Sequence, residues 1–106
     1  MTTTDFRARI RDKLLQHQDF LKTDAGTPAD LTNLDLSGWA LPGMILRKAN
    51  MQSVCFAEAD LSKADLRNAK LVLSDFADAN LHAADLRGAA LRGAKFDGAA
   101  LSSARL

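Results

Sequence analysis

The chain has 106 residues, enough for one domain, and its 14 Lys and Arg residues nearly balance its 13 Asp and Glu residues, for a formal charge of +1. This balance argues against a strong nucleic-acid footprint, which needs a basic excess, and equally against a polyanionic surface. The single Cys55 excludes an internal disulfide and fits a reducing compartment. The sequence shows no secretory signal and no apolar run long enough to span a bilayer, so we expect a cytoplasmic protein without membrane contacts.

Residues from about 5 to 22 are predicted to form an amphipathic helix, which Gly26 and Pro28 bring to an end. Its apolar side chains recur at spacings of four and seven and share one face: Phe6, Ile10, Leu14 and Leu21. The other side is basic and carries Arg7, Arg9, Arg11 and Lys13. A basic face suits a membrane-surface or nucleic-acid-binding helix, or else the solvated side of a helix that caps the following domain. The narrow apolar stripe favours the cap.

From residue 31 to the end, every fifth residue is large and apolar. The series is Leu31, Leu36, Leu41, Leu46, Met51, Phe56, Leu61, Leu66, Leu71, Phe76, Leu81, Leu86, Leu91, Phe96, Leu101 and Leu106. Alanine stands two residues before most of them, and Asp or Asn stands one residue before half of them. The repeat is therefore A-[D/N]-L-x-x, and a fixed short period is the signature of a repeat architecture.

A period of five fits neither a helix nor a straight strand. Five residues of an α-helix drift by about 140°, and an odd period sends successive strand residues to opposite faces. The large residues can face one axis only if the chain turns a corner in each repeat. The alanine then also points inward, the Asp or Asn occupies the corner and bonds nearby backbone, and the two x residues face water.

The aromatic residues give the number of repeats per coil. Phe56, Phe76 and Phe96 are spaced by 20, as are the outward Arg47, Arg67 and Arg87. A coil of four pentapeptides stacks each set in one column, at roughly the 4.8 Å separation of adjacent strands. The coils are predicted at about 29–48, 49–68, 69–88 and 89–106.

Segments such as AEADLSKADLRNAKL and ANLHAADLRGAALRGAKF resemble the pentapeptide-repeat family. The resemblance implies an all-β solenoid, a right-handed quadrilateral β-helix, over residues 29–106. With residues 1–28 as capping helix and linker, the chain has about four coils behind one N-terminal helix. Members of this family mostly act as interaction surfaces without enzymatic activity. The best-understood ones resemble duplex DNA in shape and negative charge and bind DNA gyrase, and some form homodimers through the C-terminal end.

The first coil differs from the others at its inward small positions, which hold Leu34, Trp39 and Met44. Two explanations are compatible: these side chains lean toward the capping helix, or the first coil is wider. Trp39 could also stack on a ligand, which we consider the weaker interpretation.

No cap is visible at the other end, so the last coil is predicted to expose an apolar floor formed by Leu91, Phe96, Leu101 and Leu106. Exposed apolar patches usually mark an interface. The end could stack on a second copy of the chain, or a following segment of a longer protein could cover it, and the sequence favours neither. Val72 and Leu73 break the polar pattern of the x positions and mark a second candidate contact.

The Arg47, Arg67 and Arg87 column is a candidate patch for an anion or an acidic partner. The favoured interpretation is compensation by Asp65 and Asp85 on the same face. The acidic residues Glu58, Asp78 and Asp97 are expected on a neighbouring face.

Nothing in the sequence has the spacing of a catalytic, metal or phosphate-binding motif, so no enzyme activity and no cofactor are expected. The predicted function is a protein-binding scaffold or adaptor with an unidentified partner. The alternative is a DNA mimic that interacts with gyrase, but a phosphate mimic needs a net negative field. Residues 29–106 instead carry nine acidic and nine basic residues. The same charge balance also argues against direct nucleic-acid binding.

Overall fold

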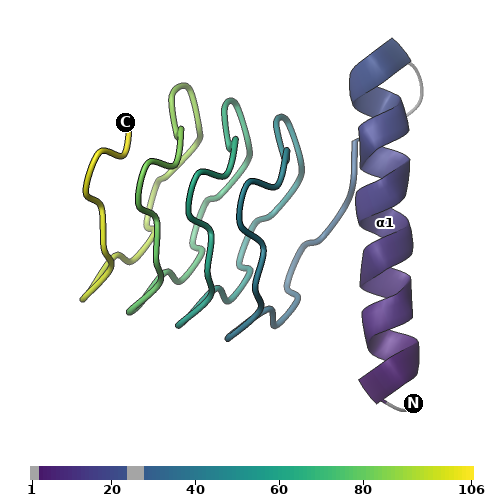
Figure 1. The fold of residues 1–106 in the computed structure, drawn as a ribbon, viewed down its shortest axis with the longest axis horizontal. Helices are drawn as coiled ribbons and strands as arrows, with labels where there is room; N and C mark the ends of the chain where they lie inside the picture. Colours follow the sequence, from purple (N-terminus) through teal and green to yellow (C-terminus); the bar gives the residue numbers. More distant parts are fainter. Residues whose placement is uncertain (1–2, 24–27) are drawn as a thin grey trace.

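The computed structural model describes residues 3–23 and 28–106 of the chain. Its single named element is the helix α1 (Thr3–Thr23). Figure 1 shows α1 at one end of a stack of coils, lying across the stacking axis, with the C-terminus at the opposite end. Gly26 and the side chain of Phe6, both used in the helix prediction, lie outside the described part.

The coils repeat every 20 residues. Each bridge in the described region is parallel and joins residues 20 apart, from Asp30↔Asn50 at one end to Asp85↔Arg105 at the other. The backbone bonds follow the same spacing, as in Leu61 N–H to Asn80 C=O (2.8 Å) and Asn80 N–H to Ala59 C=O (2.9 Å). The register predicted from the phenylalanine spacing is therefore confirmed.

Each pentapeptide contains one tight turn that spans the large apolar residue, the two x residues and the next small residue. The N–H of the fourth residue bonds the C=O of the first, as in Ala64 to Leu61 (3.0 Å). The third residue has a positive φ in every repeat from Asn33 to Ser103, between 57° and 73°. A positive φ at this position is the requirement of a type II turn.

This geometry corrects the predicted position of the corner, which is formed by the two x residues and not by the Asp or Asn. The Asp or Asn lies just before the turn, at the bridged position. Its side-chain oxygen accepts a bond of 3.0–3.2 Å from the backbone N–H two residues on, and this holds for Asp30, Asp35, Asp60, Asp65, Asp75, Asn80 and Asp85. The prediction that the Asp or Asn side chain bonds nearby backbone is confirmed. The bond stabilises the residues that lead into the turn and not the corner itself.

The described residues contain only isolated bridges and no continuous strand, which differs from the expected β-strands. Two of every five residues form the turn, and only the residue before the large apolar one makes the bridge. Consecutive residues of the chain therefore do not form a continuous β-ladder. The bridges instead connect each coil with the next one in the stack.

The core is a column of large apolar side chains flanked by alanines. From Leu31 to Leu86 the large residues are at most 1% exposed, apart from Leu41 at 7%. The three phenylalanines stack, with ring centroids 5.2 Å apart for Phe56 and Phe76 and 5.0 Å apart for Phe76 and Phe96. The rings stack in parallel because each phenylalanine belongs to the next coil, and neighbouring coils are about one strand spacing apart.

Glycines in the last coil make room for side chains of the coil before it. A Cβ atom at Gly93 would lie 2.7 Å from Cδ2 of Leu73, and the φ of Gly93 is +71°. The close approach and the left-handed backbone both favour glycine here.

Candidate interaction sites

The C-terminal end of the solenoid is apolar and open. Leu106 is 74% exposed and Leu101 36%, and Leu91 and Phe96 are only partly buried, whereas the corresponding residues one coil earlier are fully buried. Within the described residues, the backbone N–H groups of Leu91, Phe96 and Leu101 have no acceptor, although Leu71 N–H bonds Ala90 C=O in the preceding coil (2.8 Å). The end thus combines exposed apolar side chains with unpaired backbone donors.

Val72 and Leu73 lie in a turn on the side wall, one coil before the end. Leu73 is 64% exposed and Val72 is partly buried. The side chain of Leu73 reaches over Gly93 of the last coil. The two residues are therefore next to the apolar end and not on a separate part of the surface.

Arg47, Arg67 and Arg87 alternate with Asp65 and Asp85 in one ion-pair ladder along the stack. The successive N···O distances are 3.3 Å (Arg47–Asp65), 2.8 Å (Arg67–Asp65), 3.9 Å (Arg67–Asp85) and 2.6 Å (Arg87–Asp85). The first pair is a charge contact only, because Nε of Arg47 is not aligned for a hydrogen bond. The compensation that the sequence suggested is thus present in the geometry.

The ladder holds its carboxylates in the charged form. Hydrogen bonds from Arg87 are the main cause that lowers the pKa of Asp85 to about 2, with the charges of Arg87 and Arg67 adding to the effect. The hydrogen bond from Arg67 likewise lowers the pKa of Asp65. Both aspartates therefore neutralise part of the arginine charge throughout the neutral range.

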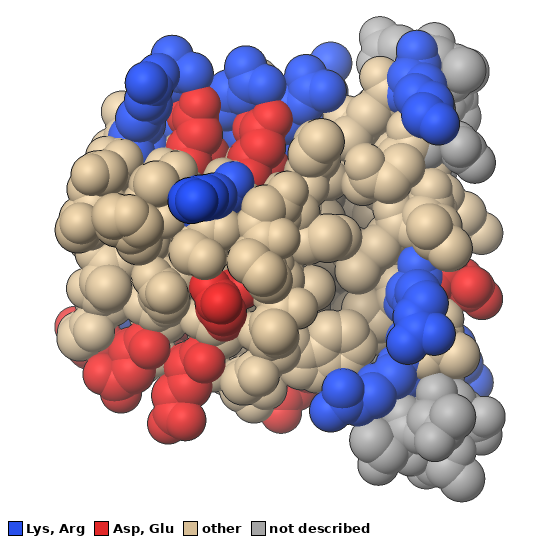
Figure 2. All heavy atoms as spheres, in the orientation of Figure 1, with Lys and Arg blue, Asp and Glu red and all other residues tan. Residues whose placement is uncertain are grey.

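Figure 2 shows Lys and Arg side chains along one edge of the coils, with acidic side chains between them, and Asp and Glu side chains along the opposite edge. The turns that carry Glu58, Asp78 and Asp97 are two turns away from the arginine turns in a coil of four. The predicted placement on a neighbouring face was wrong, because two turns of a four-cornered coil separate opposite corners.

His17 connects α1 to both ends of the first coil by hydrogen bonds. This role was not predicted from the sequence. The residue is 0% exposed. Its Nδ1 accepts the N–H of Ala29 (3.0 Å), so the ring proton is on Nε2, which donates to the C=O of Arg47 (2.6 Å). The available signal was its position seven residues after Ile10, on the apolar stripe.

Burial lowers the pKa of His17 below its ordinary 6.5, and the charge of Arg47 acts in the same direction, against the backbone bond. The neutral ring is therefore the folded form. Because the folded pKa is below the unfolded one, the contribution of His17 to stability is complete above pH 6.5 and is lost as the pH falls toward the folded pKa.

We expect α1 to loosen from the first coil as the pH falls below 6.5, and the measurement stops at about pH 5, above the range where carboxylates titrate. The only tryptophan, Trp39, contacts α1, since the guanidinium of Arg7 lies 5.3 Å from its ring centroid. Its fluorescence should shift over this pH range, and the shift should persist after His82→Gln, which removes the other histidine. An unchanged spectrum down to pH 5 would refute the expectation.

Residues 3–23 and 28–106 include no helix that is both long and apolar enough to cross a membrane. The same residues bring no three His, Cys, Asp or Glu side chains together in a way that could hold a metal ion.

The protein-family model for pentapeptide repeats matches residues 29–71, 59–98 and 74–106 of this chain, with eight copies of the repeat. The chain belongs to the pentapeptide-repeat family. Proteins of this family form right-handed quadrilateral β-helices and are generally non-enzymatic structural or binding proteins. No curated protein matches the sequence.

Two solved structures from cyanobacteria are similar to this pentapeptide-repeat protein. One is alr5209 from Nostoc PCC 7120, with 31% identity, a TM-score of 0.71 and coverage of 73% of this chain and 64% of the other. The second is Rfr23 from Cyanothece 51142, with 35% identity, a TM-score of 0.60 and coverage of 78% and 60%. The matched region thus spans less than two thirds of either relative.

Proposed function

We propose that this pentapeptide-repeat protein is a non-enzymatic binding module that contacts other proteins through the C-terminal end of its solenoid. The first partner at that surface is a second copy of the chain. The observation that carries the proposal is the open end, where Leu101 and Leu106 are exposed and backbone donors are unpaired within the described residues.

The chemistry of the end favours a protein partner. Exposed apolar side chains are removed from water when they pack against the apolar surface of another protein. The unpaired backbone N–H groups are best satisfied by the backbone carbonyls of another chain. A second copy presents the same floor of Leu91, Phe96, Leu101 and Leu106, so a two-fold axis through the end makes the contact self-complementary. Val72 and Leu73 would extend the contact onto the adjoining wall.

The charge distribution supports a protein-binding module over a DNA mimic. The arginine column is paired with Asp65 and Asp85, and residues 29–106 carry as many basic as acidic residues. We assign the arginine column a stabilising role in the stack. A surrogate for duplex DNA would need a continuous negative surface.

Replacing Leu106 with aspartate should convert the dimer to a monomer, because the charge would be buried against its own symmetry mate. Light scattering over a range of concentrations measures the change, and we expect the dissociation constant to rise at least about tenfold, or 1.4 kcal/mol. Gln52→Asp is the matched control, since it adds the same charge at an exposed position of the second coil. Monomeric wild-type protein at every concentration would overturn the proposed dimer.

A further inference from the structure

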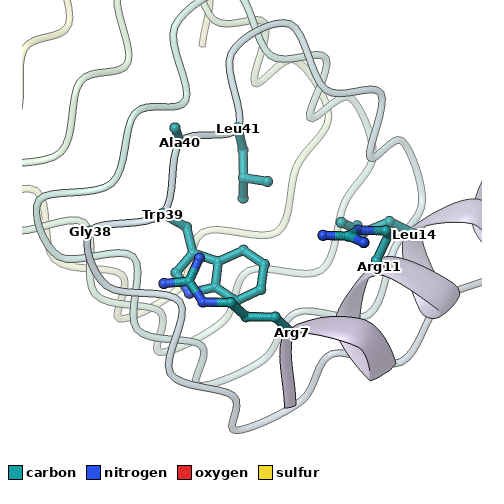
Figure 3. A pocket seen from close by; sticks show the side chains of 7 residues that line it. All are labelled: Arg7, Arg11, Leu14, Gly38, Trp39, Ala40 and Leu41. Atoms are coloured by element: carbon teal, nitrogen blue, oxygen red, sulfur yellow. The ribbon is translucent and has the colours of Figure 1, made fainter. Parts of the chain in front are cut away.

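A groove runs between α1 and the first coil, at the end of the solenoid opposite the one discussed above (Figure 3). It consists of two hollows of about 420 Å³ each, and both are lined by Arg11, Leu14 and Leu41, so they are adjacent. Trp39 and Ala40 line the first hollow, and Figure 3 shows the side chain of Arg7 lying over the indole of Trp39. We call this feature the α1 groove.

The backbone of the first coil presents an unsatisfied edge to this groove. In the second coil, Asp60 donates its N–H to Trp39 C=O (2.9 Å), and its C=O accepts from Leu41 N–H (2.7 Å). Ala40 is bridged to Asp60, so its own N–H and C=O point the other way, toward α1. Within the described residues, neither group of Ala40 forms a hydrogen bond.

Side chains of α1 satisfy two carbonyls on this edge, whereas within the described residues the backbone N–H and C=O of Asp35 are unbonded like those of Ala40. Lys13 Nζ donates to Asp30 C=O (3.1 Å), and Gln18 Nε2 donates to Ile45 C=O (3.0 Å). No described side chain of α1 bonds the backbone of Ala40, which is exposed and lines the first hollow. An extended peptide can add to such an edge by main-chain hydrogen bonds.

The side chains around the groove define what kind of peptide fits. Arg7 and Arg11 line it, and no Asp or Glu among the described residues does. Arg11 forms no ion pair within the described residues, so its guanidinium is available to a carboxylate. The second hollow is apolar, with Leu15 60% exposed, Ile45 40% exposed and Met44 partly buried.

We propose that the α1 groove binds an extended segment of a partner protein that carries alternating acidic and apolar side chains and pairs with the backbone of Ala40. The inference rests on the proposed function as a protein-binding module and adds a second surface to it. From Arg7 to Gln18, α1 rises about 16 Å, which corresponds to about five residues of extended peptide. Carboxylates of the segment contact Arg7 and Arg11, and its apolar side chains contact Leu15, Met44 and Ile45.

Selection from a phage-displayed library of random octapeptides tests the proposal without knowledge of the partner. The full chain should enrich peptides in which Asp or Glu alternates with Val, Ile or Leu. Fluorescence anisotropy with one enriched, fluorescein-labelled peptide then measures affinity. Arg11→Glu should weaken binding at least about tenfold, since it replaces an attraction with a repulsion. Arg9→Glu is the control, because Arg9 is on the same helix but does not line the groove, and it should have little effect.

The backbone pairing is tested from the side of the peptide, so that the folding of the protein is not at issue. N-methylation of alternate amides removes donors on one edge of the peptide only, and one of the two registers of methylation should abolish binding. Ala40→Pro should also weaken binding while the melting temperature stays the same, because this N–H bonds nothing in the free protein.

Any of these outcomes would overturn the proposal: enrichment without acidic residues, equal binding by the Arg11→Glu and Arg9→Glu variants, or equal binding of both N-methylated registers. A change of oligomeric state on Arg11→Glu would also overturn it, in favour of a second copy in the groove. The Leu106→Asp variant should bind the peptide normally. Failure of the peptide experiments therefore leaves the C-terminal contact standing, and failure of the dimer experiment leaves the groove standing.

Discussion

Replacing Phe76 with alanine should lower the free energy of unfolding by about 3–5 kcal/mol, the largest loss that we expect from any single truncation in the solenoid. Phe76 is 0% exposed and lies between two other rings, with centroids 5.2 and 5.0 Å away. The change removes both aromatic contacts and leaves a cavity. The turns above and below cannot collapse into this cavity, because each coil is hydrogen-bonded to its neighbours.

Urea or guanidinium denaturation monitored by circular dichroism measures this loss. Phe96→Ala is the matched control, since Phe96 stacks on Phe76 alone and is only partly buried in the last coil. Its loss should be clearly smaller. Equal losses for the two variants would contradict the stacked column as the centre of the core.

Replacing His17 with leucine should detach α1 from the first coil. Leucine keeps an apolar side chain on the stripe, but it leaves the N–H of Ala29 and the C=O of Arg47 without the partners that the imidazole supplies. Each buried group left unsatisfied costs about 1–3 kcal/mol. The two losses together exceed the free energy that the intrinsic helix propensity of α1 is expected to contribute.

Hydrogen exchange followed by mass spectrometry should show faster exchange in α1 and around Ala29, with coils two to four unchanged. Gln16→Leu serves as the control, because Gln16 is exposed on the same helix and makes no such bridge. Uniformly faster exchange over all coils would show that α1 and the stack unfold as one unit, and unchanged exchange would refute the anchoring role of His17.

The sequence determined the stack more completely than its corners. The spacing of Phe56, Phe76 and Phe96 was enough to predict the 20-residue register, because each inward side chain stacks on the residue 20 positions later. The turn was misplaced by one or two residues, because a left-handed backbone at Lys48 or Leu73 has no signature in those residue types. Glycines at the third position of the turn reveal the requirement, as do Asn33, Asn68 and Asp78.

The sites were less predictable than the fold. The exposed end followed from the repeat pattern, and so did the pairing of Arg67 with Asp65. The α1 groove did not, because it depends on how far α1 lies from the first coil and on which backbone groups its side chains reach. The position of His17 on the apolar stripe indicated burial, but its two hydrogen bonds were not predictable, since the partners are 12 and 30 residues away in the chain.

The direction of the backbone bonds has a mechanical consequence. These bonds join one coil to the next, so they run along the axis of the stack. A force that separates α1 from the last coil therefore acts along the hydrogen bonds of each coil. Coils would then peel away singly, and each would release 20 residues, or about 70 Å of extended chain. A sideways load would instead be shared by all layers in shear, so the same short rod is compliant in one direction and stiff in the other.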